Sequence, residues 1–104
     1  MQRFDPAANQ WVQLKDAPFK VSDAGAAFVG GRLIVAGGES TGTVFSTVWA
    51  YDPVSSTWST LPNLAEPRHG LGLAAIGTTL YAIDGASKTG HNASTPTLQT
   101  LTFN

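Results

Sequence analysis

The sequence predicts an all-β protein built from four-stranded antiparallel sheets that stack side by side around an axis. The first observation is an internal duplication, because a segment near the N-terminus returns in mid-chain with the same turn and core residues. The second is that each copy consists of short apolar segments separated by turns rich in Gly, Pro and Asn. The third concerns helices, which we do not expect because no segment of about a dozen residues carries apolar side chains at i, i+3, i+4 and i+7.

The composition is typical of a chain that folds into one domain. It has 104 residues, of which 42% are hydrophobic and 12% charged, and its formal net charge is −1. The few Lys and Arg residues are scattered, so we expect no nucleic acid as a partner. The absence of cysteine excludes disulfides, thiol catalysis and Cys-based zinc sites. We expect a soluble chain without a signal peptide or transmembrane segment in the sequence as given, and no membrane partner; its compartment is not predicted.

The duplication has a period of 47 residues, the distance between Trp11 and Trp58. Residues 4–15 (FDPAANQWVQLK) return as residues 51–62 (YDPVSSTWSTLP). The same shift superposes Asp5 on Asp52, Pro6 on Pro53, Leu14 on Leu61, Gly25 on Gly72, Gly30 on Gly77, Leu33 on Leu80 and Gly38 on Gly85. Further along, residues 46–52 correspond best to residues 98–104, at a shift of 52, so the second copy carries a longer loop.

Four strands are predicted for each unit. GAAFV and RLIVAGG flank Gly30-Gly31, and LGLAAI and LYAIDG flank residues 77–79, which is the spacing of tight hairpins. TVWAYD leads through an Asp-Pro turn to TWSTL, a further hairpin. The second strand is apolar on both faces, at residues 33–36 and again at 80–83. A strand buried on both faces needs a neighbour above and below, which predicts the blades of a β-propeller.

These segments resemble the kelch motif, with its small-residue first strand, aliphatic second strand ending in a double glycine, aromatic-Asp-Pro third strand and tryptophan in the fourth. The motif residues are Gly37-Gly38, Tyr51-Asp52-Pro53 and Trp58 in the first copy, and Pro67-Arg68-His69-Gly70 followed by Leu80-Tyr81-Ala82-Ile83 in the second. Two departures are visible, because Asp84-Gly85 replaces the double glycine and Lys20-Val21-Ser22 stand where the first copy would have Pro-Arg-His. The resemblance covers nearly the whole chain.

The resemblance implies about two blades of a propeller. We divide the chain into residues 1–22, the trailing strands 3 and 4 of a preceding blade, residues 23–61, a complete blade, and residues 62–104, strands 1 to 3 of the next. Propellers usually have four to eight blades, so the apolar outer faces need a cover. The favoured explanation is that the chain is part of a larger kelch protein. The alternative is a homo-oligomer, such as a trimer with six blades.

Repeated residues are expected to have structural roles. Glycine at the end of the second strand permits positive φ and a close approach of backbones. Trp11 and Trp58, with Phe4 and Tyr51, are expected to fill the wedge between adjacent blades. None of these residues is a catalytic candidate.

The partner-binding face is predicted from the loops. Connections 2–3 and 4–1 lie at one end of every blade, and here they are long, at residues 15–23, 38–46, 62–70 and 85–96. We expect this end to bind a protein partner or neighbouring blades. The candidate binding residues are Glu39, Arg68, His69, Lys20, Asp23 and Lys88. The resemblance implies ligand contact for Arg68 alone, and the favoured alternative is that Arg68 pairs with Glu66 or hydrogen-bonds loop carbonyls.

The expected function is therefore that of a non-catalytic kelch-type binding module. Enzymatic activity is a less favoured hypothesis. One alternative is a glycan-binding or sialic-acid-mutarotase-like propeller, with Arg68, Glu39 and His69 on a sugar carboxylate, and another is a purely structural fragment that self-associates. We expect no cofactor and no metal, since His69 and His91 lack further ligands, and the GLGLAA segment at residues 70–75 opens no helix that could bind a dinucleotide. The Asn92-Ala93-Ser94 sequon matters only in a secretory setting.

Overall fold

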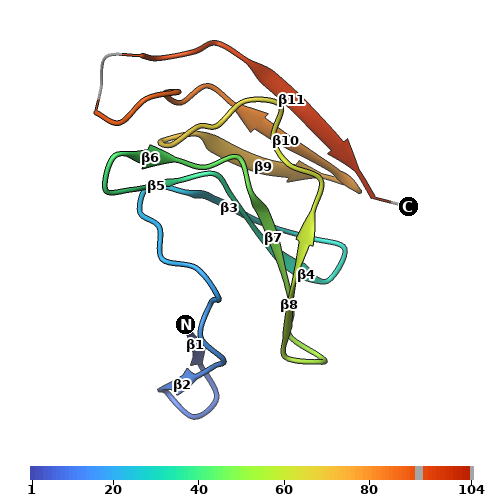
Figure 1. Cartoon of the computed structure of the whole chain (residues 1–104). Coiled ribbons are helices and arrows are strands. Elements are labelled where there is room, and N and C mark those ends of the chain that lie inside the picture. Colours follow the sequence, from blue (N-terminus) through green and yellow to red (C-terminus); the bar gives the residue numbers. More distant parts are fainter. Residues whose placement is uncertain (91–92, 104) are drawn as a thin grey trace.

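The computed structural model describes residues 1–90 and 93–103. All the regular elements in these residues are strands (Figure 1). They are β1 (Gln2–Asp5), β2 (Gln10–Gln13), β3 (Gly25–Val29), β4 (Arg32–Ala36), β5 (Glu39–Ser40), β6 (Thr43–Val44), β7 (Val48–Asp52), β8 (Thr57–Leu61), β9 (Gly72–Ile76), β10 (Thr79–Ile83) and β11 (Leu98–Thr102). The all-β class is confirmed, and the described part contains no helix with the length and hydrophobicity needed to cross a bilayer.

The strands form antiparallel sheets in the order expected for propeller blades. The first blade is the four-stranded sheet β3-β4-β7-β8, and the second blade is the three-stranded sheet β9-β10-β11. The hairpin β1-β2 is a separate sheet that stands away from both blades (Figure 1). A short hairpin, β5-β6, occupies residues 39–44, which the sequence had indicated as a loop. The chain is thus a partial propeller.

The turns repeat together with the strands. Asp5 and Asp52 each accept a hydrogen bond from the backbone two residues later, Ala7 N at 3.0 Å and Val54 N at 2.9 Å. This Asx turn sets the direction of the chain before the fourth strand of each unit. Gly30 and Gly31 both have positive φ, 60° and 77°, as a tight hairpin of right-handed twist requires.

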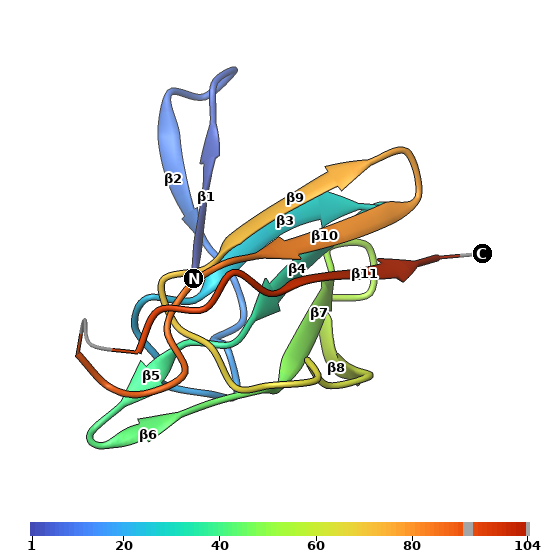
Figure 2. The ribbon, with the colours of Figure 1, turned by 90° about the horizontal axis from the view of Figure 1, so that it is seen from above.

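Burial of one face of the second strand, β4, holds the two blades together. Ile34 and Ala36 of β4 are completely buried, and they belong to one core cluster with Leu80 and Ala82 of β10. On the opposite face of β4, Leu33 and Val35 are half-buried. The first strands of the two blades, β3 and β9, lie side by side (Figure 2). The apolar pattern of residues 33–36 therefore predicted the stacking of one sheet on the next.

The glycines after the second strand permit a close approach of backbones. A Cβ on Gly37 would lie 2.2 Å from the carbonyl oxygen of Arg68, which belongs to the connection leading into the second blade. The φ angles of Gly37 and Gly38 are 68° and 102°. Asp84 adopts a φ of 58° at the position equivalent to Gly37, so the second copy keeps the same backbone path without the double glycine.

The N-terminal hairpin differs from what the sequence indicated. Phe4 and Trp11 pack on each other, with ring centroids 5.4 Å apart, but they are 44% and 66% exposed. Tyr51 and Trp58 make the equivalent pair at 5.0 Å, and Phe19 covers Trp58 edge-on. The second pair is thus covered by Phe19 of the connection before the first blade rather than by an adjacent sheet, and the filling of a wedge between blades stays a prediction for both pairs.

Replacement of Gly37 by alanine tests the close approach. We expect Gly37→Ala to lower the free energy of unfolding by about 3 kcal/mol, because a left-handed φ and a backbone clash act together. The matched control is Gly42→Ala, where φ is 79° but a Cβ meets open space, with an expected loss of about 1 kcal/mol. Urea denaturation measures both variants, and equal losses would show that the approach of Arg68 O does not constrain Gly37.

Candidate functional site

Connections 4–1 and 2–3 are fastened to each other in both units. Ser22 and Glu39 exchange two backbone hydrogen bonds of 2.9 and 2.8 Å in the first unit. His69 and Ala86 exchange an equivalent pair of 3.0 and 2.9 Å in the second. Ser22 and His69 are equivalent under the 47-residue shift, and so are Glu39 and Ala86. The two long connections of each blade therefore form one continuous platform at the same end of the molecule.

Arg68 lies inside this platform and has no exposed surface. Its Nη1 donates to the carbonyl oxygens of Thr97 at 2.7 Å and Asp84 at 3.1 Å, and its Nη2 donates to Oε1 of Gln99 at 2.7 Å. The charged guanidinium thus fastens the connection before β9 to the end of β10 and the approach to β11. Of the two roles considered for Arg68, the structure has the hydrogen bonds to backbone carbonyls and no ion pair with Glu66 among the described residues.

His69 is the other buried polar residue on the platform, with 3% of its surface exposed. Its Nδ1 lies 2.8 Å from Oδ2 of Asp23, in the first unit, and its Nε2 lies 2.7 Å from the carbonyl oxygen of Lys88. Oε2 of Glu39 is 3.7 Å from the same Nε2. The hydrogen bond to Asp23 raises the pKa of His69 above its ordinary 6.5, while burial opposes this shift and the Lys88 carbonyl and the two acidic charges add to it.

Asp23, Glu39 and His69 also satisfy the simplest requirement for a metal site. Their possible ligand atoms lie within 4.8 Å of one another. A metal needs a lone pair on an imidazole nitrogen. Here both ring nitrogens already face oxygen acceptors at hydrogen-bond distance, so a cation would have to displace one of these contacts. The oxygen atoms around the ring therefore suit the N–H groups of an imidazole better than they suit a metal ion.

The six predicted site residues thus separate into different environments. Asp23, Glu39 and His69 meet at the boundary between the two blades, and Lys88 joins them through its backbone carbonyl. Lys20 is exposed and lines a shallow depression together with Glu39. Arg68 is buried in the second blade. His91 and Asn92 lie outside the described residues.

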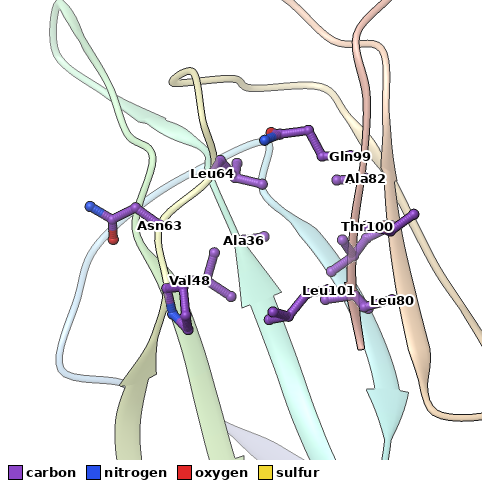
Figure 3. A pocket seen from close by; sticks show the side chains of 11 residues that line it. Ala36, Val48, Asn63, Leu64, Leu80, Ala82, Gln99, Thr100 and Leu101 are labelled. Atoms are coloured by element: carbon purple, nitrogen blue, oxygen red, sulfur yellow. The ribbon is translucent and has the colours of Figure 1, made fainter. Parts of the chain in front are cut away.

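A small apolar cavity between the blades was not predicted. Its volume is about 180 Å³, and Figure 3 shows Val48 and Leu64 on one side and Leu80 and Leu101 on the other. One of its polar side chains, Gln99, accepts hydrogen bonds from Arg68 and from the Ala65 amide. Asn63 and Thr100 also line the cavity, and the rest of its lining is mainly apolar, as expected where two sheet faces pack.

Replacement of Arg68 by lysine tests its structural role. We expect Arg68→Lys to reduce the free energy of unfolding by about 3 kcal/mol, because one ammonium group cannot reach acceptors on Thr97, Asp84 and Gln99 together. Arg3→Lys is the matched control at an exposed position, with an expected change within about 0.5 kcal/mol. Chemical denaturation of both variants decides, and an unchanged midpoint for Arg68→Lys would contradict the assignment.

The stacking of a four-stranded sheet on a three-stranded one, the positive-φ glycines and the repeated loop bridges are the features of a partial β-propeller built from repeated motifs. A family model described as the Kelch motif matches residues 20–65. The chain belongs to the kelch-repeat family.

Named relatives agree with this family. The chain is 36% identical to Kelch-like ECH-associated protein 1A of Danio rerio, over 88% of this chain and 16% of that protein. It is 33% identical to an F-box/kelch-repeat protein of Arabidopsis thaliana, over 82% of this chain and 23% of that protein. It is 31% identical to Kelch-like protein 9 of Mus musculus, over 89% of this chain and 16% of that protein. The chain therefore spans less than a quarter of the length of these relatives.

Proposed function

We propose that the chain is part of a non-catalytic kelch-type binding module that presents its 2–3 and 4–1 connections to a protein partner. The supporting observation is the pair of backbone bridges, Ser22 with Glu39 and His69 with Ala86, which fastens these connections together in both units. Loops held in this way can offer side chains to a partner with little loss of conformational entropy on binding. One relative, of Danio rerio, is named as an ECH-associated protein.

The exposed side chains of the platform define the proposed contact surface. Lys20, Asp23 and Lys88 are exposed residues, and the side chain of Glu39 keeps 27% of its surface. His69 and Arg68 support this surface from below, because both are buried and hydrogen-bonded within the platform. The surface thus carries both signs of charge, which favours a partner recognised by charge pairing at specific points rather than by a uniform field.

The alternatives have less support. A sugar-binding role would use Arg68 on a carboxylate, but the side chain has no exposed surface and both its terminal nitrogens donate to protein acceptors. A purely structural role explains the exposed apolar faces of the blades, but it gives no function to the connections that form the platform. We therefore retain the protein-binding module.

The division into units is part of the same proposal. Residues 1–22 would supply strands 3 and 4 of one blade, residues 23–61 a complete blade, and residues 62–104 strands 1 to 3 of another. The outer face of the second blade exposes Ile76 by 68%, Leu98 by 58% and Ile83 by 41%. The equivalent face of the first blade is covered by the second. Further blades of the same polypeptide would cover the outer face in the same way, and a six-bladed trimer is the alternative.

Charge reversal on the platform tests the proposed function. In the natural polypeptide that contains these residues, we expect Lys20→Glu combined with Lys88→Glu to reduce capture of the partner at least about fivefold, since each reversed contact costs roughly 1 kcal/mol. Val54→Glu combined with Ser55→Glu is the control, placed in the exposed 3–4 turn at the opposite end of the blade. Quantitative affinity capture compares the two, after equal denaturation midpoints have been established. Loss of capture in the control, or unchanged capture in the platform variant, would contradict the proposal.

The mass of the 104-residue chain in solution tests the cover of the outer face. We expect association that grows with concentration, driven by Ile76, Ile83 and Leu98, without a closed species. Light scattering coupled to gel filtration measures it. A single trimer of constant mass over a hundredfold dilution would favour the six-bladed ring instead.

A further inference from the structure

His69 touches three separate segments at the boundary between the blades. Its Nδ1 contacts Asp23, which directly precedes the first blade, and its Nε2 contacts the carbonyl of Lys88, in the connection that follows β10. Glu39, at the start of β5, lies 3.7 Å from Nε2. One buried ring therefore joins the first blade to a long connection of the second.

The partners of the ring determine its protonation state. A backbone carbonyl can only accept, so Nε2 must donate its hydrogen to Lys88 O. An ionised Asp23 carboxylate also only accepts, so Nδ1 must donate as well. Either neutral tautomer would place a nitrogen lone pair against an oxygen at 2.7 or 2.8 Å. With Asp23 ionised, both contacts exist together only when the ring is an imidazolium.

We propose that protonated His69 is a latch that holds the segment around Lys88 against the first blade, and that loss of its proton releases one of the two contacts. Lys88 belongs to the proposed partner-binding surface. A regulatory role of the latch in partner binding therefore rests on the proposed function. The latch itself depends only on the ring and its acceptors. It exists in one copy, since the equivalent position carries Ser22, whose hydroxyl lies 3.3 Å from the Glu39 carbonyl and has no charge to lose.

The charges around the ring give the direction of the effect. Among the described residues, Asp23 and Glu39 are the charged groups facing the ring, while Lys88 contributes its carbonyl and Arg68 directs its guanidinium to β10, β11 and the residues beside them. The two carboxylates favour the imidazolium and outweigh burial, so the pKa is raised in the folded protein. The stability from the latch is therefore fully present below the ordinary pKa of 6.5 and is lost as pH rises through the higher folded value.

The test follows the ring directly by ¹H–¹⁵N NMR of the imidazole nitrogens during a pH titration. We expect both nitrogens to be protonated at pH 6.5 and the midpoint to lie above this ordinary value. Backbone amides of residues 86–90 should exchange faster with solvent as the ring deprotonates, with the same midpoint. A midpoint at or below 6.5, or amide exchange that does not follow the ring, would overturn the latch.

Variants at Asp23 and Glu39 leave His69 in place, so the test does not depend on a His69 variant that could fail to fold. We expect Asp23→Asn to lower the midpoint by about one pH unit, a tenfold change in proton affinity, since it removes the closest opposite charge. Glu39→Gln should lower it by less, and Asp16→Asn, at an 89% exposed side chain remote from the ring, should not change it. An Asp23→Asn midpoint equal to that of the unmodified protein contradicts the proposal.

Two further outcomes separate the latch from its competitors. Addition of equimolar zinc should leave the titration unchanged, and disappearance of a ring N–H signal on zinc addition would overturn the latch in favour of a metal site. None of these readouts needs a partner. A failure of the latch therefore leaves the platform variants to be judged by themselves, and a failure of partner binding leaves the titration unaffected.

Discussion

The contact of one sheet face with the next is the constraint on which the structure depends. β4 is apolar on both faces, and the face with Ile34 and Ala36 belongs to one core cluster with Leu71, Leu80 and Ala82 of the following blade and its lead-in. This contact brings the connection before β9 so near to the end of β4 that a side chain at Gly37 would meet the Arg68 carbonyl. The same contact places His69 beside Asp23, 46 residues earlier in the chain. The core and the platform are thus two consequences of one stacking.

Much of the fold could be predicted because stacking leaves a local pattern. Positions that serve every blade repeat at 47 residues, and the hairpin turns are determined by glycine and Asx residues close in sequence. The hairpin β5-β6 could not be predicted in this way, since two residues per strand carry no readable periodicity. The exposure of Trp11 was also not predictable from its repeated position, because burial there requires a sheet that the described chain does not supply.

The site was predicted less completely than the fold. The long connections indicated one end of the blades, but they did not distinguish the buried Arg68 from the partly exposed Glu39. The acceptors of Arg68 at Thr97 and Asp84 are backbone carbonyls, and because every residue type has a carbonyl, the sequence could not identify them. The meeting of His69 with Asp23 did leave a signal. His69 is equivalent to Ser22, so in a stack of repeats it must lie near the residue that follows Ser22.

Because equivalent residues of successive repeats lie near each other, the charged cluster is formed by two repeats together. Asp23 and Glu39 come from one repeat and His69 and Lys88 from the next, so neither repeat contains the cluster by itself. The junction between blades is the smallest complete site. Where the two copies differ at equivalent positions, serine in one and histidine in the other, the junctions they make differ in charge and in response to pH, although the sheets beneath them are alike. Divergence between repeats can therefore alter the end of the propeller that carries the long connections without disturbing the apolar contact that holds the blades together.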